Sequence, residues 1–303
     1  MRPTSRQKEY WYLRELKAKK EYDKSEAETL KELTKIYQDM EASVQKEIDA
    51  FYGRYAKKEG VTMAEARRRA DRLDIEEYGR KAERYVRDRD LSPQANKEMR
   101  LYNLTMKANR LEVLKAKIQL ELVRCYEEMG QTMSQALSDR AYDEMERQAG
   151  ILGQTVPDPQ TAAESIVNAS FKGATFSARI WQSQALLRDE LNVQLQIGLI
   201  QGKNSRVLAR AIRDRFGVSK RNAERLMRTE LCRVQIEAQM RSYEAMKFDE
   251  YMFIALETAC DICNTLDGET FKVADALSGE NSPPMHPNCR CSTAAYVSEP
   301  IFK

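Results

Sequence analysis

The chain is poor in the two residues that most often interrupt regular secondary structure. Its 303 residues include only 12 glycines and 8 prolines, whereas an all-β protein needs many of both for its turns. This scarcity predicts long helices rather than many short strands. Charged residues make up 32% of the chain and hydrophobic residues 42%, so these helices should expose wide polar faces and one large apolar core is not expected.

The first 150 residues carry 32 basic and 29 acidic side chains and are predicted to form long, charged helices over roughly 5–58, 62–89 and 92–148. Thr62 followed by Glu65 is a capping box that would begin the second helix. In the third, apolar residues recur at a period close to 3.6, namely Leu104, Met106, Leu111, Leu114, Ile118, Leu122 and Cys125. Helices of this kind bury little surface alone, so we expect them to bind a partner.

A break follows in residues 149–160, which contain two glycines and two prolines. We therefore predict three segments: an extended helical region over 1–150, a helical region over 151–249, and a small β-rich module over 250–303. Within the middle segment, a turn near 198–205 and a helix beginning at Ser219 are expected. The predicted fold class is mainly α, with long N-terminal helices, a helical middle region and a C-terminal zinc module.

The last fifty residues differ in character from the rest. Tyr251–Leu256 is rich in aromatic and branched residues and predicts a strand. Asp267-Gly268 is a strong hairpin-turn dipeptide, and Thr270-Phe271 predicts the returning strand. The prolines at 283, 284 and 287 then impose loop conformation.

Four of the six cysteines and the single histidine lie in this module. Cys260 and Cys263 are followed, after 22 residues, by His286, Cys289 and Cys291. Because two residues between ligands let one tight turn present both to one ion, we predict a structural zinc site of Cys260, Cys263, His286 and Cys289, with Cys291 as an alternative ligand. The competing interpretation is disulfides or reduced thiols in an ordinary core. The polar N-terminus, without the apolar segment of a signal peptide, argues against export and so against disulfides.

The single histidine excludes a Ser-His-Asp triad, a three-histidine zinc site and an HExxH protease. All four expected zinc positions are filled by protein ligands, which leaves none for a reacting water. We therefore expect no enzymatic activity. No run of 18 apolar residues occurs, so no membrane-spanning helix is expected.

Residues 201–233 carry 10 basic and 3 acidic side chains. Helical spacing places part of them on one side, namely Arg206, Arg210, Arg213 and Lys220 or Arg221. This surface would suit weak, sequence-independent contact with a phosphate backbone, or would simply be a solvated helix face. Downstream, Arg228-Thr229-Glu230 could form a partly buried ion pair or face solvent.

The chain resembles the phage Mu-type head morphogenesis family, the minor capsid or minor head proteins of tailed bacteriophages. The resemblance covers roughly residues 160–295. It is carried by the run from Gly202 to Glu230, Cys260-Asp-Ile-Cys263, Leu266-Asp-Gly268, Phe271, and Pro284-Met-His-Pro-Asn-Cys-Arg-Cys291. The first 150 residues contribute no motif to it.

The resemblance implies a virion component that is present in the host cytoplasm during assembly. It further implies binding to the phage portal protein at the portal vertex, with scaffold or capsid proteins as further partners, and a role in procapsid assembly that extends to DNA packaging or ejection. An alternative function is a zinc-stabilised, nucleic-acid-binding regulator, although the zinc-like module is acidic. A hydrolase or transferase would need a free thiolate near His286.

Overall fold

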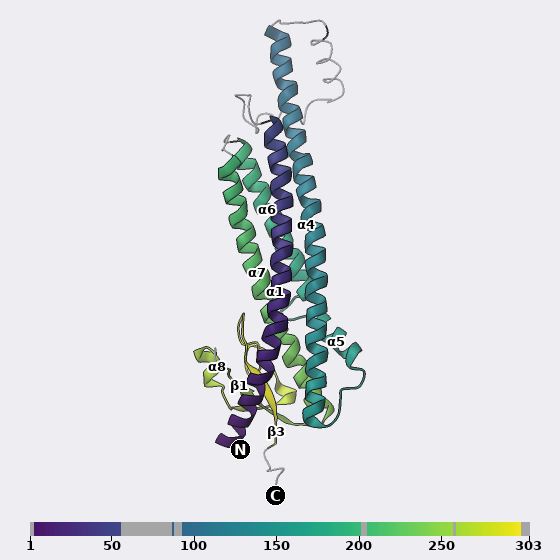
Figure 1. Cartoon of the computed structure of the whole chain (residues 1–303), viewed down its shortest axis with the longest axis vertical. Coiled ribbons are helices and arrows are strands. Elements are labelled where there is room, and N and C mark those ends of the chain that lie inside the picture. Colours follow the sequence, from purple (N-terminus) through teal and green to yellow (C-terminus); the bar gives the residue numbers. More distant parts are fainter. Residues whose placement is uncertain (1–2, 56–86, 88–92, 201–204, 257–258, 298–303) are drawn as a thin grey trace. The chain divides into compact units, whose positions relative to one another are not determined.

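The computed structural model describes residues 3–55, 87, 93–200, 205–256 and 259–297. Most of this part of the chain lies in helices α1 (Ser5–Tyr55), α4 (Pro93–Leu152), α6 (Phe176–Ile200) and α7 (Ser205–Ala245), with the shorter α5 (Pro159–Asn168) and α8 (Asp261–Thr265) (Figure 1). The prediction of a mainly α fold with a C-terminal strand region is confirmed. The helix predicted over 62–89, with its Thr62–Glu65 capping box, lies outside the described residues.

The C-terminal strands form one antiparallel sheet of three strands in the order β2-β1-β3. Strand β1 (Glu250–Ile254) is central, between β2 (Thr270–Lys272) and β3 (Ser292–Tyr296), and its Tyr251 lies opposite Phe271 and Ala295. The predicted strand and its returning strand are both confirmed. The turn before β2 contains Gly268, whose φ of 72° favours glycine. Strand β3, which directly follows the last cysteine, was not predicted from the sequence.

The chain forms two compact units, each made of segments that are distant in sequence. The sheet unit comprises Met1–Ile36, Glu127–Gln182 and Lys220–Lys303, and the helical unit comprises Tyr37–Tyr126 and Ser183–Ser219. Helices α1, α4, α6 and α7 contribute residues to both. The division at residues 150 and 250 follows changes of composition along the chain, and as a statement about independent folding units it stays a prediction.

The helical unit has a core of aliphatic and aromatic side chains from the four long helices. In α4 the buried residues include Leu111, Leu114, Ile118, Leu122 and Cys125, as the helical period predicts. Three buried hydroxyls lie among them: the Ser219 oxygen is 3.0 Å from that of Tyr37 and 2.8 Å from that of Tyr126. The prediction that a helix begins at Ser219 is wrong, because α7 begins at Ser205. The Ser219 hydroxyl forms hydrogen bonds with these two tyrosines instead of capping a helix.

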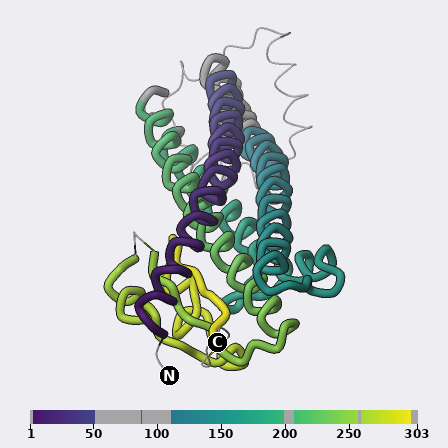
Figure 2. Tube along the Cα trace, turned by 60° about the horizontal axis from the view of Figure 1, so that its bottom comes forward, coloured from purple at the N-terminus to yellow at the C-terminus, as the bar shows by residue number. Residues whose placement is uncertain are grey.

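In the sheet unit, the start of α1 packs on the sheet. Trp11, Tyr12 and Leu16 contact a buried cluster formed by Met252, Ile254, Leu256, Ala294 and Tyr296. Figure 2 shows this first part of α1, in purple, beside the C-terminal strand in yellow. The first described helix and the last described strand therefore share one core.

A buried polar network lies in the sheet unit. The Arg147 guanidinium donates to both oxygens of Glu15, each at 2.9 Å, and to Glu144 at 2.7 Å. Gln239 also donates to Glu144, and Ser292 to Glu15, each at 2.8 Å. Burial raises the pKa of Glu15. Burial also acts to raise the pKa of Glu144, but the Arg147 charge and the hydrogen bonds hold it below its usual value.

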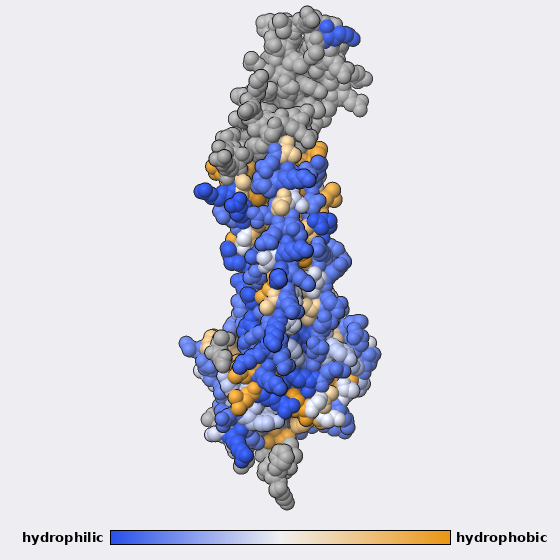
Figure 3. Space-filling view, viewed as in Figure 1, coloured by the Kyte–Doolittle hydropathy of each residue, from blue (hydrophilic) through white to orange (hydrophobic). Residues whose placement is uncertain are grey.

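The face of the protein in Figure 3 is largely hydrophilic, with small hydrophobic patches between the polar residues, several of them in the lower part of the view. This agrees with the charged helix faces expected from the sequence. Within the part of the chain that the structure describes, no helix combines the length and apolar character needed to cross a membrane.

Candidate metal centre

Cys260 and Cys263 lie at the first turn of α8, where Cys260 is the residue before the helix and Cys263 is inside it. One helical turn therefore brings the two side chains to the same side, with their sulfurs 3.7 Å apart. Cys263 is fully buried and Cys260 partly so. The two-residue spacing thus brings both cysteines to one side of a single turn, as the sequence predicts.

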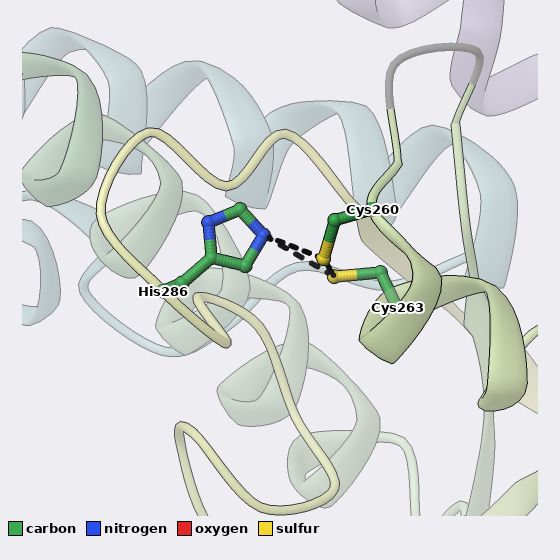
Figure 4. A group of neighbouring side chains, drawn as sticks. All are labelled: Cys260, Cys263 and His286. Carbon is green, nitrogen blue, oxygen red and sulfur yellow. Dashed lines mark hydrogen bonds between the residues drawn. The ribbon is translucent and has the colours of Figure 1, made fainter.

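His286 reaches these sulfurs from the loop between β2 and β3. Its Nε2 is 3.3 Å from the Cys260 sulfur and 3.5 Å from the Cys263 sulfur (Figure 4). Its Nδ1 is 2.9 Å from the Pro287 carbonyl oxygen. With Nδ1–H donating to that carbonyl, the Nε2 lone pair faces the two cysteines, which is the usual arrangement of a histidine that binds a metal.

Cys289 and Cys291 complete the cluster from the same loop. The Cys289 sulfur is 4.0 Å from that of Cys263, and the sulfurs of Cys263, Cys289 and Cys291 all lie within 4.8 Å of one another. A tetrahedral zinc ion with Zn–S of about 2.3 Å and Zn–N of about 2.0 Å places sulfurs about 3.8 Å apart and sulfur and nitrogen about 3.5 Å apart. The separations of 3.3 to 4.0 Å given above are close to these values, so the cluster could hold a metal ion.

All five predicted ligands are therefore close together, but in two groups. Cys260, Cys263 and His286 form one, and Cys263, Cys289 and Cys291 form the other. Cys263 is the residue that they share. We use the name cysteine–histidine cluster for these five residues.

Cys232 was not predicted to lie at this site. The sequence places it, like Cys125, among small buried hydrophobic residues, and both are buried. However, Cys232 projects from α7 into the same core as Cys263, Cys289 and Cys291, and its thiol is 3.8 Å from the Cys291 carbonyl oxygen. No spacing signal could reveal this, because Cys232 lies far upstream on another element.

The thiols differ in acidity because of their hydrogen bonds and burial. Hydrogen bonds from Cys232 and Cys291 lower the pKa of Cys289 to about 2. The same hydrogen bond to Cys289, together with burial, raises the pKa of Cys291 and that of Cys232. Burial raises the pKa of Cys263 to about 12. Cys289 is therefore readily deprotonated, which is the form that metals bind.

Charged and polar groups hold the cysteine loop against helices α1 and α7. Arg290, between the last two cysteines, pairs with Asp23 at 2.7 Å and also with Glu26. Arg228 pairs with the same Glu26 at 3.3 Å. The Thr229 hydroxyl accepts a hydrogen bond of 3.1 Å from the backbone N–H of Asn288.

The third residue of the Arg228-Thr229-Glu230 motif is fully inside the protein. Glu230 accepts from Arg179 at 2.8 Å and from Arg233 at 2.6 Å, and Arg233 also donates to the Ile166 carbonyl at 2.9 Å. The sequence left a partly buried ion pair and a solvated face as alternatives. The structure has ion pairs, and their partners lie outside the motif.

This arrangement can be compared with known proteins. The turn of Cys260 and Cys263, the loop of His286 to Cys291, and the supporting motif of α7 all lie within one matched region. Residues 189–294 match the family model described as Phage Mu protein F like protein. The match covers about a third of the chain and confirms the resemblance to the Mu-type family there. Neither a curated protein nor a solved structure matches the chain.

The residues predicted to contact nucleic acid are only partly described. The Arg206 side chain lies outside the described part of the structure. In the helical unit, Arg210 and Arg213 are exposed, and Arg213 is 3.4 Å from Glu41. In the sheet unit, Arg221 is exposed and Lys220 is 3.8 Å from Glu224. Nucleic-acid contact by these residues stays a prediction. Neighbouring glutamates partly neutralise the charges of Arg213 and Lys220.

Proposed function

We propose that this protein is a minor capsid protein of a tailed phage or prophage that acts in head morphogenesis at the portal vertex. The observation that carries the proposal is the match of residues 189–294 to the Phage Mu protein F like family. The matched region contains the whole cysteine–histidine cluster and the helix that supports it. Family likeness in this region supports a shared role more strongly than the helical fold alone, because long helices occur in many unrelated proteins.

We further propose that the cluster holds one structural zinc ion through Cys260, Cys263 and His286, with Cys289 or Cys291 as the fourth ligand. The donors are thiolates and an imidazole, which suit zinc better than a hard ion. When bound, the ion would join α8 to the loop before β3 and so stabilise a module too small for a large core. No reaction is assigned to the cluster, and we propose that the protein is not an enzyme.

The proposed partner is the portal protein of the same phage, with scaffold or capsid proteins as further partners. The long charged helices of this chain support such a role, because they offer extended polar surfaces to another protein. The proposed location is the virion, and the host cytoplasm during assembly. A contribution to DNA packaging or ejection would involve only weak, sequence-independent contact through the exposed arginines of α7.

Co-expression with the portal protein tests the proposal. We expect the two to co-purify as a complex, and we expect the chain in mature particles at far fewer copies than the major capsid protein by quantitative mass spectrometry. Absence from both procapsids and virions would contradict the head-morphogenesis function. Tight, salt-insensitive binding to one DNA sequence would instead support a zinc-stabilised regulator.

A further inference from the structure

The sheet unit contains more metal ligands than one tetrahedral ion uses. Such an ion takes four ligands, whereas the cluster has five and Cys232 lies beside it. The five do not form one compact set: Cys260 and His286 group with Cys263, and Cys289 and Cys291 group with the same Cys263. A single ion would therefore have to draw its fourth ligand from the second group and leave another thiol of that group unused.

A cavity of about 40 Å³ reaches part of the second group. Cys289 and Cys291 line it together with Cys232 and with charged side chains that include Glu15, Asp23 and Arg290, whereas Cys260, Cys263 and His286 do not line it. The volume exceeds what one water molecule needs, so an ion could reach Cys289 and Cys291 without passing the first group.

We propose that the sheet unit binds a second thiophilic divalent ion through Cys263, Cys289 and Cys291, with the Cys263 thiolate bridging it to the first ion. This goes beyond the single structural zinc of the proposed function and rests on it for the first ion. With both ions bound, Cys289 and Cys291 belong to the second, so each ion has three protein ligands and the first keeps Cys260, Cys263 and His286. Thiolate sulfur keeps further lone pairs after binding one metal, so it can bind two. The 4.0 Å between the sulfurs of Cys263 and Cys289 is close to the roughly 3.8 Å expected between two ligands of one zinc ion.

Charge balance favours two ions in this buried position. Cys263, Cys289 and Cys291 are all buried, and uncompensated charge is costly there. Metal-bound cysteines are thiolates, whereas a ligating histidine is neutral. The four thiolates of the cluster therefore carry four negative charges, which two divalent ions neutralise.

The test is the zinc content of the full chain, purified with zinc, desalted and analysed by elemental analysis against protein concentration. We expect about two zinc ions per chain in the wild type and about one in Cys291→Ala. Cys260→Ala should also keep one, in the second position. Alanine is used because a serine hydroxyl would be buried without a partner. Cys125→Ala, which removes a buried thiol of the helical unit, is the matched control and should keep two.

The outcomes separate the two proposals. One ion in the wild type and in Cys291→Ala, lost in Cys260→Ala, would overturn the second site and leave the structural zinc standing. Two ions in Cys291→Ala would overturn the ligand assignment. No ion in the wild type would overturn both.

Cobalt titration of the metal-free wild type keeps the proposal testable if Cys291→Ala fails to fold. The sulfur-to-cobalt charge-transfer absorbance should rise until two equivalents are added. Saturation at one equivalent would contradict the second site.

Discussion

The helical unit and the sheet unit are stabilised by different kinds of interaction. Buried side chains of the helical unit are almost all apolar among the described residues, and its three buried hydroxyls bond one another. The sheet unit instead buries Glu15, Glu144 and Glu230 with their arginine and glutamine partners, beside the cysteine–histidine cluster. Apolar burial is non-directional and tolerant. Charged networks and metal sites need every partner in place. Removal of one group should therefore cost the sheet unit more stability than it costs the helical unit.

Metal removal should give the largest difference in stability loss between the sheet unit and the helical unit. Chelation should destabilise the sheet unit by up to about 10 kcal/mol, the order of zinc-binding free energies in small zinc domains. Cys260→Ala, which removes a ligand of the first ion only, should destabilise it by less. Hydrogen exchange followed by mass spectrometry should then show lost protection in β1 and β3. Protection should persist in the helical-unit part of α4 (residues 111–126).

Cys125→Ala is the control for this measurement, since it shortens a buried cysteine without touching the cluster. Unchanged protection of β1 and β3 in chelator would mean that the thiols do not stabilise the module.

The buried ion network should give the next largest effect. Arg147→Met leaves Glu15 and Glu144 without their shared cation, which should cost about 3–5 kcal/mol in the free energy of unfolding. Urea denaturation measures it. Arg124→Met in the helical unit is the matched control, because Arg124 is 55% exposed beside Glu121 and should cost less than about 1 kcal/mol. Equal losses in the two variants would show that burial of the network contributes little.

Removing one of the three bonded hydroxyls of the helical unit should have a smaller effect on stability. Ser219→Ala should cost about 1 kcal/mol, since the hydroxyls of Tyr37 and Tyr126, 3.2 Å apart, still bond each other. Ser242→Ala in the sheet unit is its control. Among the described residues, the Ser242 hydroxyl has one partner, the Ala238 carbonyl of its own helix at 2.8 Å, so its loss should be close to neutral. A larger loss for Ser242 than for Ser219, by urea denaturation, would reverse this interpretation.

Surface arginines should matter least for stability. Arg210→Gln with Arg213→Gln should change the unfolding free energy by no more than about 0.5 kcal/mol per site. If these residues contact DNA, the slope of log affinity against log salt should fall in magnitude by about 2. Fluorescence anisotropy with a short duplex measures this, and Arg124→Gln with Arg188→Gln controls for charge. An equal change in the control pair would mean that α7 has no specific part in DNA contact.

Features set by local sequence could be predicted, and features set by distant contacts could not. The period of α4 and the Cys260–Cys263 turn depend on neighbouring residues, so the sequence predicts both. The placement of Cys232 beside Cys289, and of Glu15 beside Ser292, depends on helices packing on the sheet. Ser219 is a further example, because a serine suits the start of a helix as well as a buried position inside one. Its buried position, set by two distant tyrosines, decides its role instead.

The pairing of Glu15 with Ser292 and of Asp23 with Arg290 has a consequence for how the chain is made. These partners are separated by 277 and 267 positions, so α1 cannot form these contacts until the ribosome has synthesised residues that far downstream. At about 5–20 residues per second, translation across the 277 positions from Glu15 to Ser292 takes about 14–55 s. During that time the Trp11 and Leu16 face of α1 has no sheet to cover it. A nascent chain of this design should therefore depend on chaperones until its last cysteine leaves the ribosome.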